Sequence, residues 1–306
     1  MTTAHHAPAL SVTDVSKSHR QRGTVVRAVR EVSFTVERGE SVALVGANGA
    51  GKSSVLRLLA GLTRPDAGVI ELGGNRLPHQ AAAALLDVGC LIDRPGLLGG
   101  LSGQANLEVI ARRHGLGGEP VTTILDRCGL DRRAWSRTVA SYSLGMRQRL
   151  GLAVALLGQP GTLLLDEPST GIDAAGTAWL RTVIGEQVAS GGSVLIASHQ
   201  LDEVERTCSS AVILQAGQVR FFGPLQPLRT ATPLAHALAV TGSVEVAAAA
   251  LRRHGWTLQA NADHLALDLT EAEAGRLSLD LAGEGIGITR LAPTEGLLER
   301  LQRKAS

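Results

Sequence analysis

The sequence has few aromatic residues and few cysteines. Its 306 residues include one tyrosine, three phenylalanines, three tryptophans and three cysteines. Cys90, Cys128 and Cys208 are widely spaced and form no C-x-x-C pair, which argues against a disulfide framework or a zinc site. We expect them to be reduced thiols that pack as small hydrophobic side chains.

Positive charge is also scarce. Lys17, Lys52 and Lys304 are the only lysines, the arginines are scattered, and the formal net charge is +2. A protein that tracks nucleic acid needs a basic face or stripe. The sequence has neither, so we expect no nucleic-acid partner.

Long apolar runs are missing as well. No stretch approaches the roughly 18 to 20 apolar residues that cross a bilayer as a helix. The start, Met1–His6, lacks the basic and apolar regions of a signal peptide. We therefore expect a cytosolic chain, and its hydrophobic content of 44% suffices for a large core.

The strongest positive signal is a glycine-rich loop. Residues 46–53 read G-A-N-G-A-G-K-S and match the phosphate-binding pattern G-x-x-x-x-G-K-[ST]. The strand-like run 41–45 precedes the loop and the helix-like run 54–59 follows it, which is the context that this motif requires. The sequence therefore predicts a site for a nucleoside triphosphate.

The residue types of this loop suit phosphate groups. Glycines let the backbone turn tightly, so that successive N–H groups converge on the β-phosphate at a helix N-terminus. Lys52 is expected to reach the β- and γ-phosphates, and the Ser53 hydroxyl to bind Mg²⁺. The nucleotide-binding residues predicted in the loop are Gly46, Asn48, Gly49, Ala50, Gly51, Lys52, Ser53 and Ser54.

Strand and helix patterns alternate along most of the chain, which predicts an α/β fold: a mostly parallel sheet covered by helices. Helical patterns over 102–140 interrupt this alternation and suggest an insert. The predicted strands of the core are 10–15, 29–36, 41–45, 69–72, 88–91, 162–166, 193–197, 211–215 and 218–222.

Two carboxylates end the buried strand at 162–166. Buried carboxylates need partners or a metal. With Lys52 nearby, Asp166 is expected to hold Mg²⁺, and Glu167, directed differently, to orient or deprotonate the water that attacks the γ-phosphate. Taken alone, the two acids would indicate only an ordinary junction between a strand and a loop.

The segment 142–149, Y-S-L-G-M-R-Q-R, resembles the signature motif of ATP-binding cassette (ABC) ATPases, whose simplest form is L-S-G-G-Q. Ser143 and Gly145 match this motif, whereas Leu144 and Met146 depart from it. A serine and free N–H groups at a helix N-terminus form an anion site. The resemblance implies that this site meets the γ-phosphate held by another subunit, with two ATP molecules sandwiched in a homodimer. Without the resemblance, Ser143 would be an ordinary N-cap.

Two further positions match the family. Asp173 ends the segment P-S-T-G-I-D, which resembles the loop that links the two sites across the dimer. Asp173 is also a plausible helix N-cap. His199 follows a buried strand and resembles the switch histidine that contacts the γ-phosphate, although a lone histidine there is usually structural. The resemblance covers about residues 10–225, and the signature is similar to those of the bacitracin-resistance, lantibiotic-immunity and daunorubicin-resistance exporters.

Two positions depart from the family pattern. His19 stands where the family often has an aromatic residue on the adenine; an imidazole also stacks, with less area, but His19 could equally be a plain loop residue. Asp93 replaces the glutamine that links Mg²⁺ and water to the membrane partner, where lantibiotic and bacitracin types commonly have Glu. We assign Asp93 to the metal site.

The remaining residues follow the order βαββαβ with a final helix, which suggests a small ferredoxin-like domain after a linker marked by Pro224, Pro227 and Pro233. The predicted domains are an ABC ATP-binding domain at 1–225, with a helical subdomain at about 95–157, and an accessory α+β domain at 226–306.

The resemblance implies a P-loop NTPase that uses ATP and Mg²⁺, with Glu167, His199 and Lys52 in catalysis. It would power export of a drug or antimicrobial peptide through separate transmembrane permease subunits, at the inner face of the membrane. Two alternatives remain. A soluble cassette ATPase acting on ribosomes or DNA would favour tandem cassettes, a coiled-coil insert or a basic face, and a phosphate-loop kinase or GTPase would lack the signature.

Overall fold

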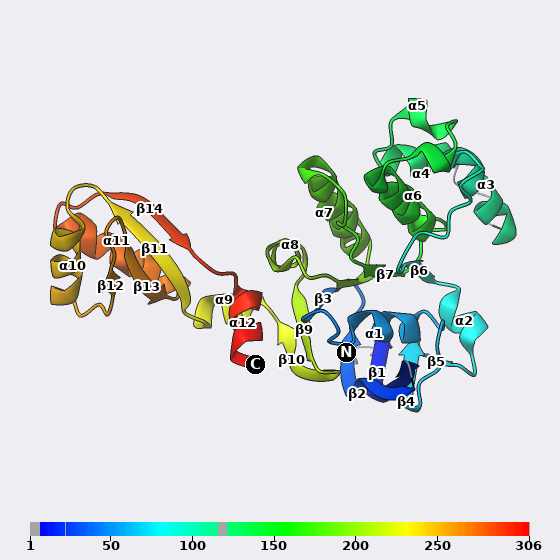
Figure 1. The fold of residues 1–306 in the computed structure, drawn as a ribbon, viewed down its shortest axis with the longest axis horizontal. Coiled ribbons are helices and arrows are strands. Elements are labelled where there is room, and N and C mark those ends of the chain that lie inside the picture. The colour runs from blue at the N-terminus through cyan, green and yellow to red at the C-terminus, as the bar shows by residue number, and fades with distance from the viewer. Residues whose placement is uncertain (1–6, 22, 116–120, 306) are drawn as a thin grey trace, which may run out of the picture. The chain divides into compact units, whose positions relative to one another are not determined.

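The computed structural model describes residues 7–21, 23–115 and 121–305 (Figure 1). The expectation about Met1–His6 lies outside these residues. The described residues within Met1–Gln200 and Arg206–Gly223 form one compact unit. The described residues within Leu201–Glu205 and Pro224–Ser306 form a second. Over the described residues, no helix is both long and apolar enough to cross a bilayer.

The centre of the first unit is a six-stranded sheet in the order β10-β9-β3-β8-β7-β6. Its strands are β3 (Ser41–Val45), β6 (Val88–Leu91), β7 (Thr162–Asp166), β8 (Ser193–Ala197), β9 (Ser210–Gln215) and β10 (Gln218–Pro224). The pairs β3–β8, β3–β9, β7–β8 and β6–β7 are parallel. Every residue of β3, β7 and β8 is buried, as expected for parallel strands covered on both faces. The predicted α/β fold is confirmed.

The first strands of the chain form a separate antiparallel sheet, so the expectation of one mostly parallel sheet was incomplete. Its order is β2-β1-β4-β5, with β1 (Leu10–Gln21), β2 (Thr24–Val36), β4 (Ala67–Leu72) and β5 (Asn75–Leu77). β1 and β2 are longer than predicted because their tips pair as an exposed ribbon, in which His19 is opposite Val26. Buried and exposed residues do not alternate along that ribbon. Such alternation is the usual sequence signal of a strand.

Helices cover the parallel sheet and form the predicted insert. α1 (Lys52–Leu59) and α7 (Ala174–Ala189) pack against the parallel sheet, whereas α2 (Ala81–Leu85) contacts β4 and β5 of the antiparallel sheet. The insert contains α3 (Gly103–Arg113), α4 (Val121–Arg127), α5 (Arg132–Trp135), the short η1 (Val139–Ser141) and α6 (Leu144–Leu156), which gather together in Figure 1. Ser102 caps α3 by accepting a hydrogen bond from the Ala105 N–H.

None of the three cysteines forms a disulfide within the described part of the chain. Burial raises the pKa of Cys90 to about 11 and that of Cys128 to about 12. Both thiols therefore stay protonated at neutral pH, in agreement with the expected role as packed hydrophobic side chains.

The second unit has the predicted βαββαβ order. Its elements are β11 (Leu234–Val240), α10 (Val244–Arg253), β12 (Gln259–Ala260), β13 (Leu265–Leu269), α11 (Glu271–Gly283) and β14 (Ile288–Pro293). The strands form an antiparallel sheet in the order β12-β13-β11-β14. Leu238, Leu251, Leu265 and Leu277 belong to the hydrophobic core between this sheet and its helices.

Three further segments complete the second unit. α9 (Gln226–Ala231) occupies the region that the prolines had marked as a linker, with a proline in its first turn, where the missing N–H costs nothing. α12 (Leu297–Ala305) is the expected last helix. The first five residues of α8 (Leu201–Thr207) also belong to this unit, which no pattern in the sequence indicated.

Two leucines of α11 test the core of the second unit. Leu277 is fully buried and Leu279 is 74% exposed. We expect Leu277→Ala to destabilise this unit by roughly 2–5 kcal/mol, because it removes buried methyl groups and leaves a cavity, and Leu279→Ala to change stability by less than about 0.5 kcal/mol. Native-state hydrogen exchange of β11 and β13 measures both; equal protection in the two variants would contradict the packing described here.

Candidate active site

The glycine-rich loop runs from the end of β3 to the start of α1, and its shape depends on two glycines. A Cβ at Gly46 would overlap the carbonyl oxygen of Leu214. Gly51 has a φ of 109°, and a Cβ there would overlap the carbonyl oxygen of Ala28 in β2. The loop is therefore held against its neighbours by close backbone contacts that only glycine permits.

Lys52 begins α1 and lies against this loop. It is only 7% exposed, and its Nζ donates to the carbonyl oxygen of Gly46 at 2.7 Å. Gly51, the N-cap of α1, has no side chain to cap the first N–H groups of the helix. An ammonium group and uncapped helical N–H groups together form an anion site.

The other residues predicted to bind the nucleotide lie in the loop and in the first turn of α1. Asn48 and Gly49 are exposed at the tip, whereas Ala50 is buried. Ser54, in the first turn of α1, has its Oγ 3.5 Å from His19 Nε2 of β1. His19 thus lies beside the first turn of α1, and its stacking on adenine stays a prediction.

Asp166, the last residue of β7, is 7% exposed. Burial raises its pKa, and the nearby carboxylates of Glu167 and Asp93 raise it further, whereas a hydrogen bond with the Ser53 side chain and the charge of Lys52 act in the opposite direction. Three carboxylates close together repel one another, and a divalent cation would relieve that repulsion. Because hydroxyl and carboxylate oxygens are the ligands that Mg²⁺ prefers, the residues here fit a Mg²⁺ triphosphate.

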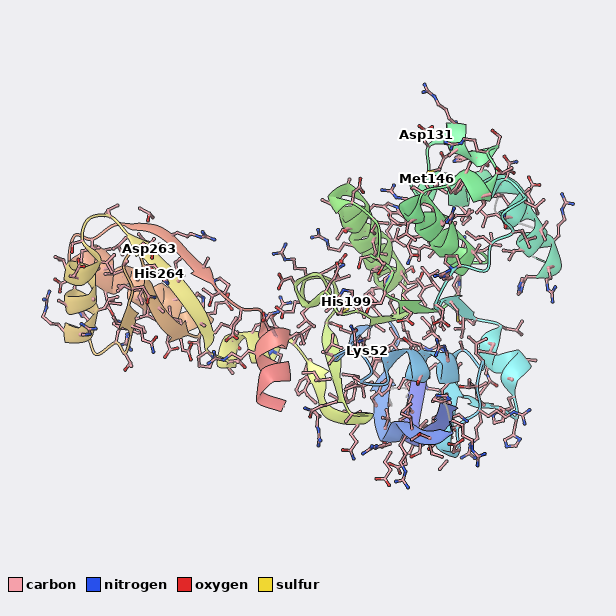
Figure 2. The ribbon with its side chains drawn as sticks, in the orientation of Figure 1. Lys52, Asp131, Met146, His199, Asp263 and His264 are labelled. Carbon is pink, nitrogen blue, oxygen red and sulfur yellow. The ribbon has the colours of Figure 1, made fainter. Side chains whose placement is uncertain are left out.

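The backbone changes direction at Glu167, directly after β7. Glu167 has a φ of 47°, in the left-handed region that non-glycine residues rarely adopt, and its N–H donates to the carbonyl oxygen of Ala197 at 2.8 Å. The side-chain Oε2 lies 2.7 Å from His199 Nδ1 and 3.4 Å from Ser198 Oγ. β8, which precedes His199, pairs with β3 and β7, so the histidine follows at the edge that also carries Lys52 (Figure 2).

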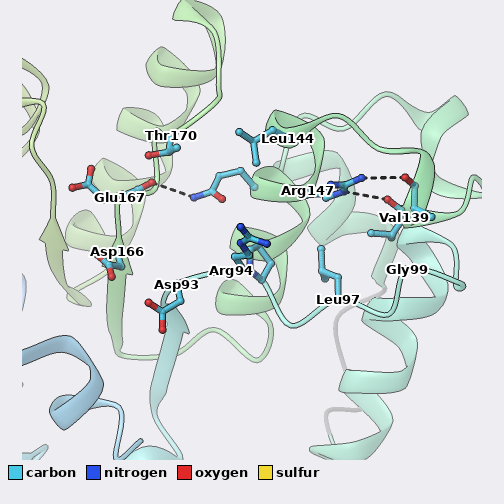
Figure 3. A pocket seen from close by; sticks show the side chains of 13 residues that line it. Asp93, Arg94, Leu97, Gly99, Val139, Leu144, Arg147, Asp166, Glu167 and Thr170 are labelled. Atoms are coloured by element: carbon cyan, nitrogen blue, oxygen red, sulfur yellow. Dashed lines mark hydrogen bonds between the residues drawn. The ribbon is translucent and has the colours of Figure 1, made fainter. Parts of the chain in front are cut away.

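Asp93 follows β6 and lines a cavity of about 550 Å³ together with Asp166 and Glu167 (Figure 3). Its carboxylate is already paired: Arg57 of α1 donates from Nη2 at 2.6 Å and from Nε at 3.0 Å. The two bonds to Asp93 raise the pKa of Arg57. Asp93 thus lies in the same cavity as Asp166, the other predicted carboxylate ligand of the metal. It is paired with Arg57, a cation that the sequence did not indicate.

Gln148 is a second contact that the sequence analysis missed. It lies in α6, is 8% exposed, and its Nε2 donates to the main-chain oxygen of Glu167 at 3.3 Å. The same helix carries Ser143 at its N-cap. Gln148 therefore ties the helix of the signature segment to the turn that holds Glu167. Neither Gln148 nor Arg57 stood out in the sequence, because only the fold brings Gln148 to the main chain of Glu167 and Arg57 to the carboxylate of Asp93.

Ser143, Gly145 and Asp173 lie together around a second cavity of about 320 Å³. Ser143 Oγ accepts from the Met146 N–H at 3.2 Å, and Asp173 Oδ1 accepts from the Gly176 N–H at 2.8 Å. The residues lining this cavity do not include the glycine-rich loop. Figure 2 shows Met146 well apart from Lys52. One chain therefore brings the predicted site residues together in two groups.

Comparisons with known proteins agree on one family. A family model described as ABC transporter matches residues 29–170. The ABC transporter ATP-binding protein NatA of Bacillus subtilis (strain 168) is 34% identical over 224 residues, which cover 72% of this chain and 91% of NatA.

Other relatives carry more specific names. The daunorubicin resistance ATP-binding protein DrrA3 of Streptomyces coeruleorubidus is 35% identical over 67% of this chain and 66% of its own length. The lantibiotic transport ATP-binding protein SrtF of Streptococcus pyogenes is 32% identical over 69% of this chain and 88% of its own. A solved structure, of the ATP binding subunit of an ABC transporter, has a TM-score of 0.66 and 28% identity, and covers 90% of this chain and 99% of that one.

His19 provides a test of the adenine position. If its ring stacks on the base, we expect His19→Tyr to tighten nucleotide binding by no more than the roughly 1–3 kcal/mol that stacking contributes, and His19→Ala to weaken it. Titration with a fluorescent ATP analogue measures the three affinities. Equal values would mean that His19 is only a strand residue next to Ser54.

Proposed function

The chain belongs to the ABC transporter family as one of its ATP-binding ATPase subunits, and we propose that it drives an exporter by binding and hydrolysing Mg²⁺-ATP at the edge formed by β3, β7 and β8. The observation that carries this proposal is the contact of Glu167 with His199 next to the glycine-rich loop. This contact pairs Glu167, the candidate base, with His199, which is expected to contact the γ-phosphate.

Several residues of this chain would hold the nucleotide. Lys52, now bonded to the Gly46 carbonyl, would exchange that contact for phosphate oxygens, which form stronger, charge-assisted bonds. Ser53, Asp166 and Asp93 would hold Mg²⁺. Mg²⁺ bound by these residues would supply positive charge that offsets the negative charge developing on the phosphate oxygens.

Glu167 would accept the proton of the attacking water through its carboxylate. His199 holds that carboxylate at 2.7 Å from its Nδ1 and would contact the γ-phosphate from the same position. Gln148 would keep the main chain of Glu167 in place, which fixes the direction of the side chain. This arrangement orients a base before the substrate arrives.

A second copy of the chain would complete the site. Ser143, Gly145 and Asp173 line one cavity whose lining does not include the glycine-rich loop of the same chain, and they would form a second anion-binding group. In a two-fold homodimer each such group faces the loop of the partner, so that two ATP molecules are enclosed. This proposal rests on the separation of the two groups in one chain and on the family resemblance.

The exported substrate class is taken from the relatives. DrrA3 is named for daunorubicin resistance and SrtF for lantibiotic transport. We infer that this chain acts at the inner face of the membrane, held there by separate transmembrane permease subunits, and that the cargo is a drug or an antimicrobial peptide. Asp93 would link the nucleotide to these subunits, because it lines one cavity together with Asp166 and residues of the helical insert.

Glu167→Gln tests the base. We expect ATP affinity to be kept and turnover to fall by about 10² or more, because the isosteric amide cannot accept the proton of the water. ATP should then make the variant dimerise on size exclusion chromatography. Retained turnover would exclude Glu167 as the base, and an ATP-loaded variant that remains monomeric would exclude the sandwich.

Lys52→Ala serves as the contrasting variant. It removes a charge-assisted contact to the phosphates, so we expect the loss of triphosphate binding itself rather than of turnover alone. A fluorescent ATP analogue separates the two variants. If Lys52→Ala binds as tightly as the unchanged protein, the lysine does not contact the phosphates.

Asp93→Ala tests coupling. We expect the isolated subunit to keep ATP binding and much of its basal hydrolysis, while export by the assembled transporter falls sharply because the link to the helical insert is lost. Cell resistance or vesicle transport at equal expression measures the effect. Asp126→Ala is the matched control, because Asp126 forms a similar two-bond pair with Arg132 on the surface of the insert. Full export by Asp93→Ala would show that Asp93 is only a surface acid.

A further inference from the structure

The carboxylates of Asp93 and Asp166 lie at the same edge of the parallel sheet. Leu91 of β6 is opposite Leu165 of β7, and the two acids follow these residues directly after their strands end. Both acids line the cavity of about 550 Å³ (Figure 3). Burial raises the pKa of Asp166, and the charges of Glu167 and Asp93 raise it further. Negative charges this close together oppose the entry of another anion, such as a triphosphate.

One face of α1 serves both of these carboxylates. Ser53 and Arg57 are four residues apart in this helix, so their side chains lie on the same face. The Ser53 side chain forms a hydrogen bond with Asp166. One turn later, the Arg57 guanidinium donates to Asp93 from Nη2 at 2.6 Å and from Nε at 3.0 Å. These bonds raise the pKa of Arg57, and the charge of Asp166 acts in the same direction.

The pair of Arg57 and Asp93 affects the charge of the site more than the stability of the fold. The two side chains are 39% and 48% exposed, and water screens ion pairs this exposed, so they add little to stability. Two parallel N–H···O bonds nevertheless fix the geometry, because a planar guanidinium matches a carboxylate. The pair therefore neutralises Asp93 and holds it to α1.

A negative charge at Asp93 has two opposite effects on a nucleotide. It attracts the divalent cation, because carboxylate oxygens are preferred ligands of Mg²⁺, and it repels the triphosphate. Arg57 weakens both effects, because it offsets the charge and occupies the carboxylate oxygens.

We propose that Arg57 is a positioning residue that sets the Mg²⁺ requirement of nucleotide binding: it holds Asp93 as a counter-ion, which admits the triphosphate and makes the metal compete for the carboxylate. The proposal rests on the Mg²⁺-ATP site proposed above. Arg57 itself contacts neither the base nor the reacting phosphate in this assignment, so its effect appears in the metal dependence of binding.

The ratio of ATP affinity in excess Mg²⁺ to ATP affinity in EDTA measures this requirement, with a fluorescent ATP analogue as the probe. We expect Arg57→Met to raise the ratio by roughly tenfold, because one positive charge near the metal-free triphosphate is lost and Asp93 is freed for the metal. Arg57→Lys keeps the charge and should move the ratio less than Arg57→Met does. An unchanged ratio in Arg57→Met would overturn the proposal.

Asp93 provides the opposite change. Asp93→Asn removes the negative charge at nearly constant shape and leaves Arg57 in place, so we expect the ratio to fall. In the double variant Arg57→Met/Asp93→Asn the two changes of charge cancel, and the ratio should return to near that of the unchanged protein. Asp93→Asn tests the charge balance even if Arg57→Met fails to fold. A ratio that does not fall in Asp93→Asn, or a double variant with a ratio as high as that of Arg57→Met, would contradict the proposal.

Arg132→Met is the matched control. Arg132 binds Asp126 from the same two atoms, Nε at 3.1 Å and Nη2 at 2.8 Å, and neither residue lines the cavity that contains Asp93. We expect its ratio to stay unchanged, and a rise equal to that of Arg57→Met would overturn the proposal.

The unchanged protein separates the two levels of inference. If it does not bind the analogue, or binds it equally with and without Mg²⁺, the Mg²⁺-ATP site itself is refuted. If it shows a clear Mg²⁺ dependence that Arg57→Met leaves unaltered, only the role of Arg57 is refuted.

Discussion

The parallel pairing of β8 between β3 and β7 is the constraint on which the rest of this structure depends. In the register of these strands, Ala197 lies opposite Leu44 on one side and opposite Asp166 on the other. This register brings the ends of three strands to one edge, so that the glycine-rich loop, the two acids and the histidine all follow there. A slip of one residue would draw Asp166 or Glu167 along the sheet and separate them from Lys52.

Each carboxylate at this edge has a partner from a different element. Asp93 pairs with Arg57, Glu167 with His199, and Asp166 with the Ser53 side chain. A triphosphate and its metal would have to exchange some of these contacts for new ones. If nucleotide binding exchanges these pairs, the site would have at least two arrangements, and the nucleotide would select between them by its differential affinity.

Much of this could be read from the sequence, because the signals are local. Lys52, Asp166 and Glu167 stand at fixed distances from a strand or helix pattern, and β7 and β8 have the predicted bounds. The exposed ribbon of β1 and β2 could not be read, since no buried face marks it. The contacts of Arg57 and Gln148 depend on which helix the fold places beside which loop, and no spacing along the chain encodes that.

The division of α8 between two units has a consequence for how the protein is made. Glu205 and Leu298 are separated by 93 positions, so the ribosome synthesises α8 well before the residue of α12 that contacts Glu205. At synthesis rates of about 5–20 residues per second, this delay is roughly 5–20 s. During that interval the nascent chain has every motif of an ATPase but lacks the contact that anchors Glu205. Residues 201–205 can therefore reach their final packing only after most of the C-terminal unit has been synthesised.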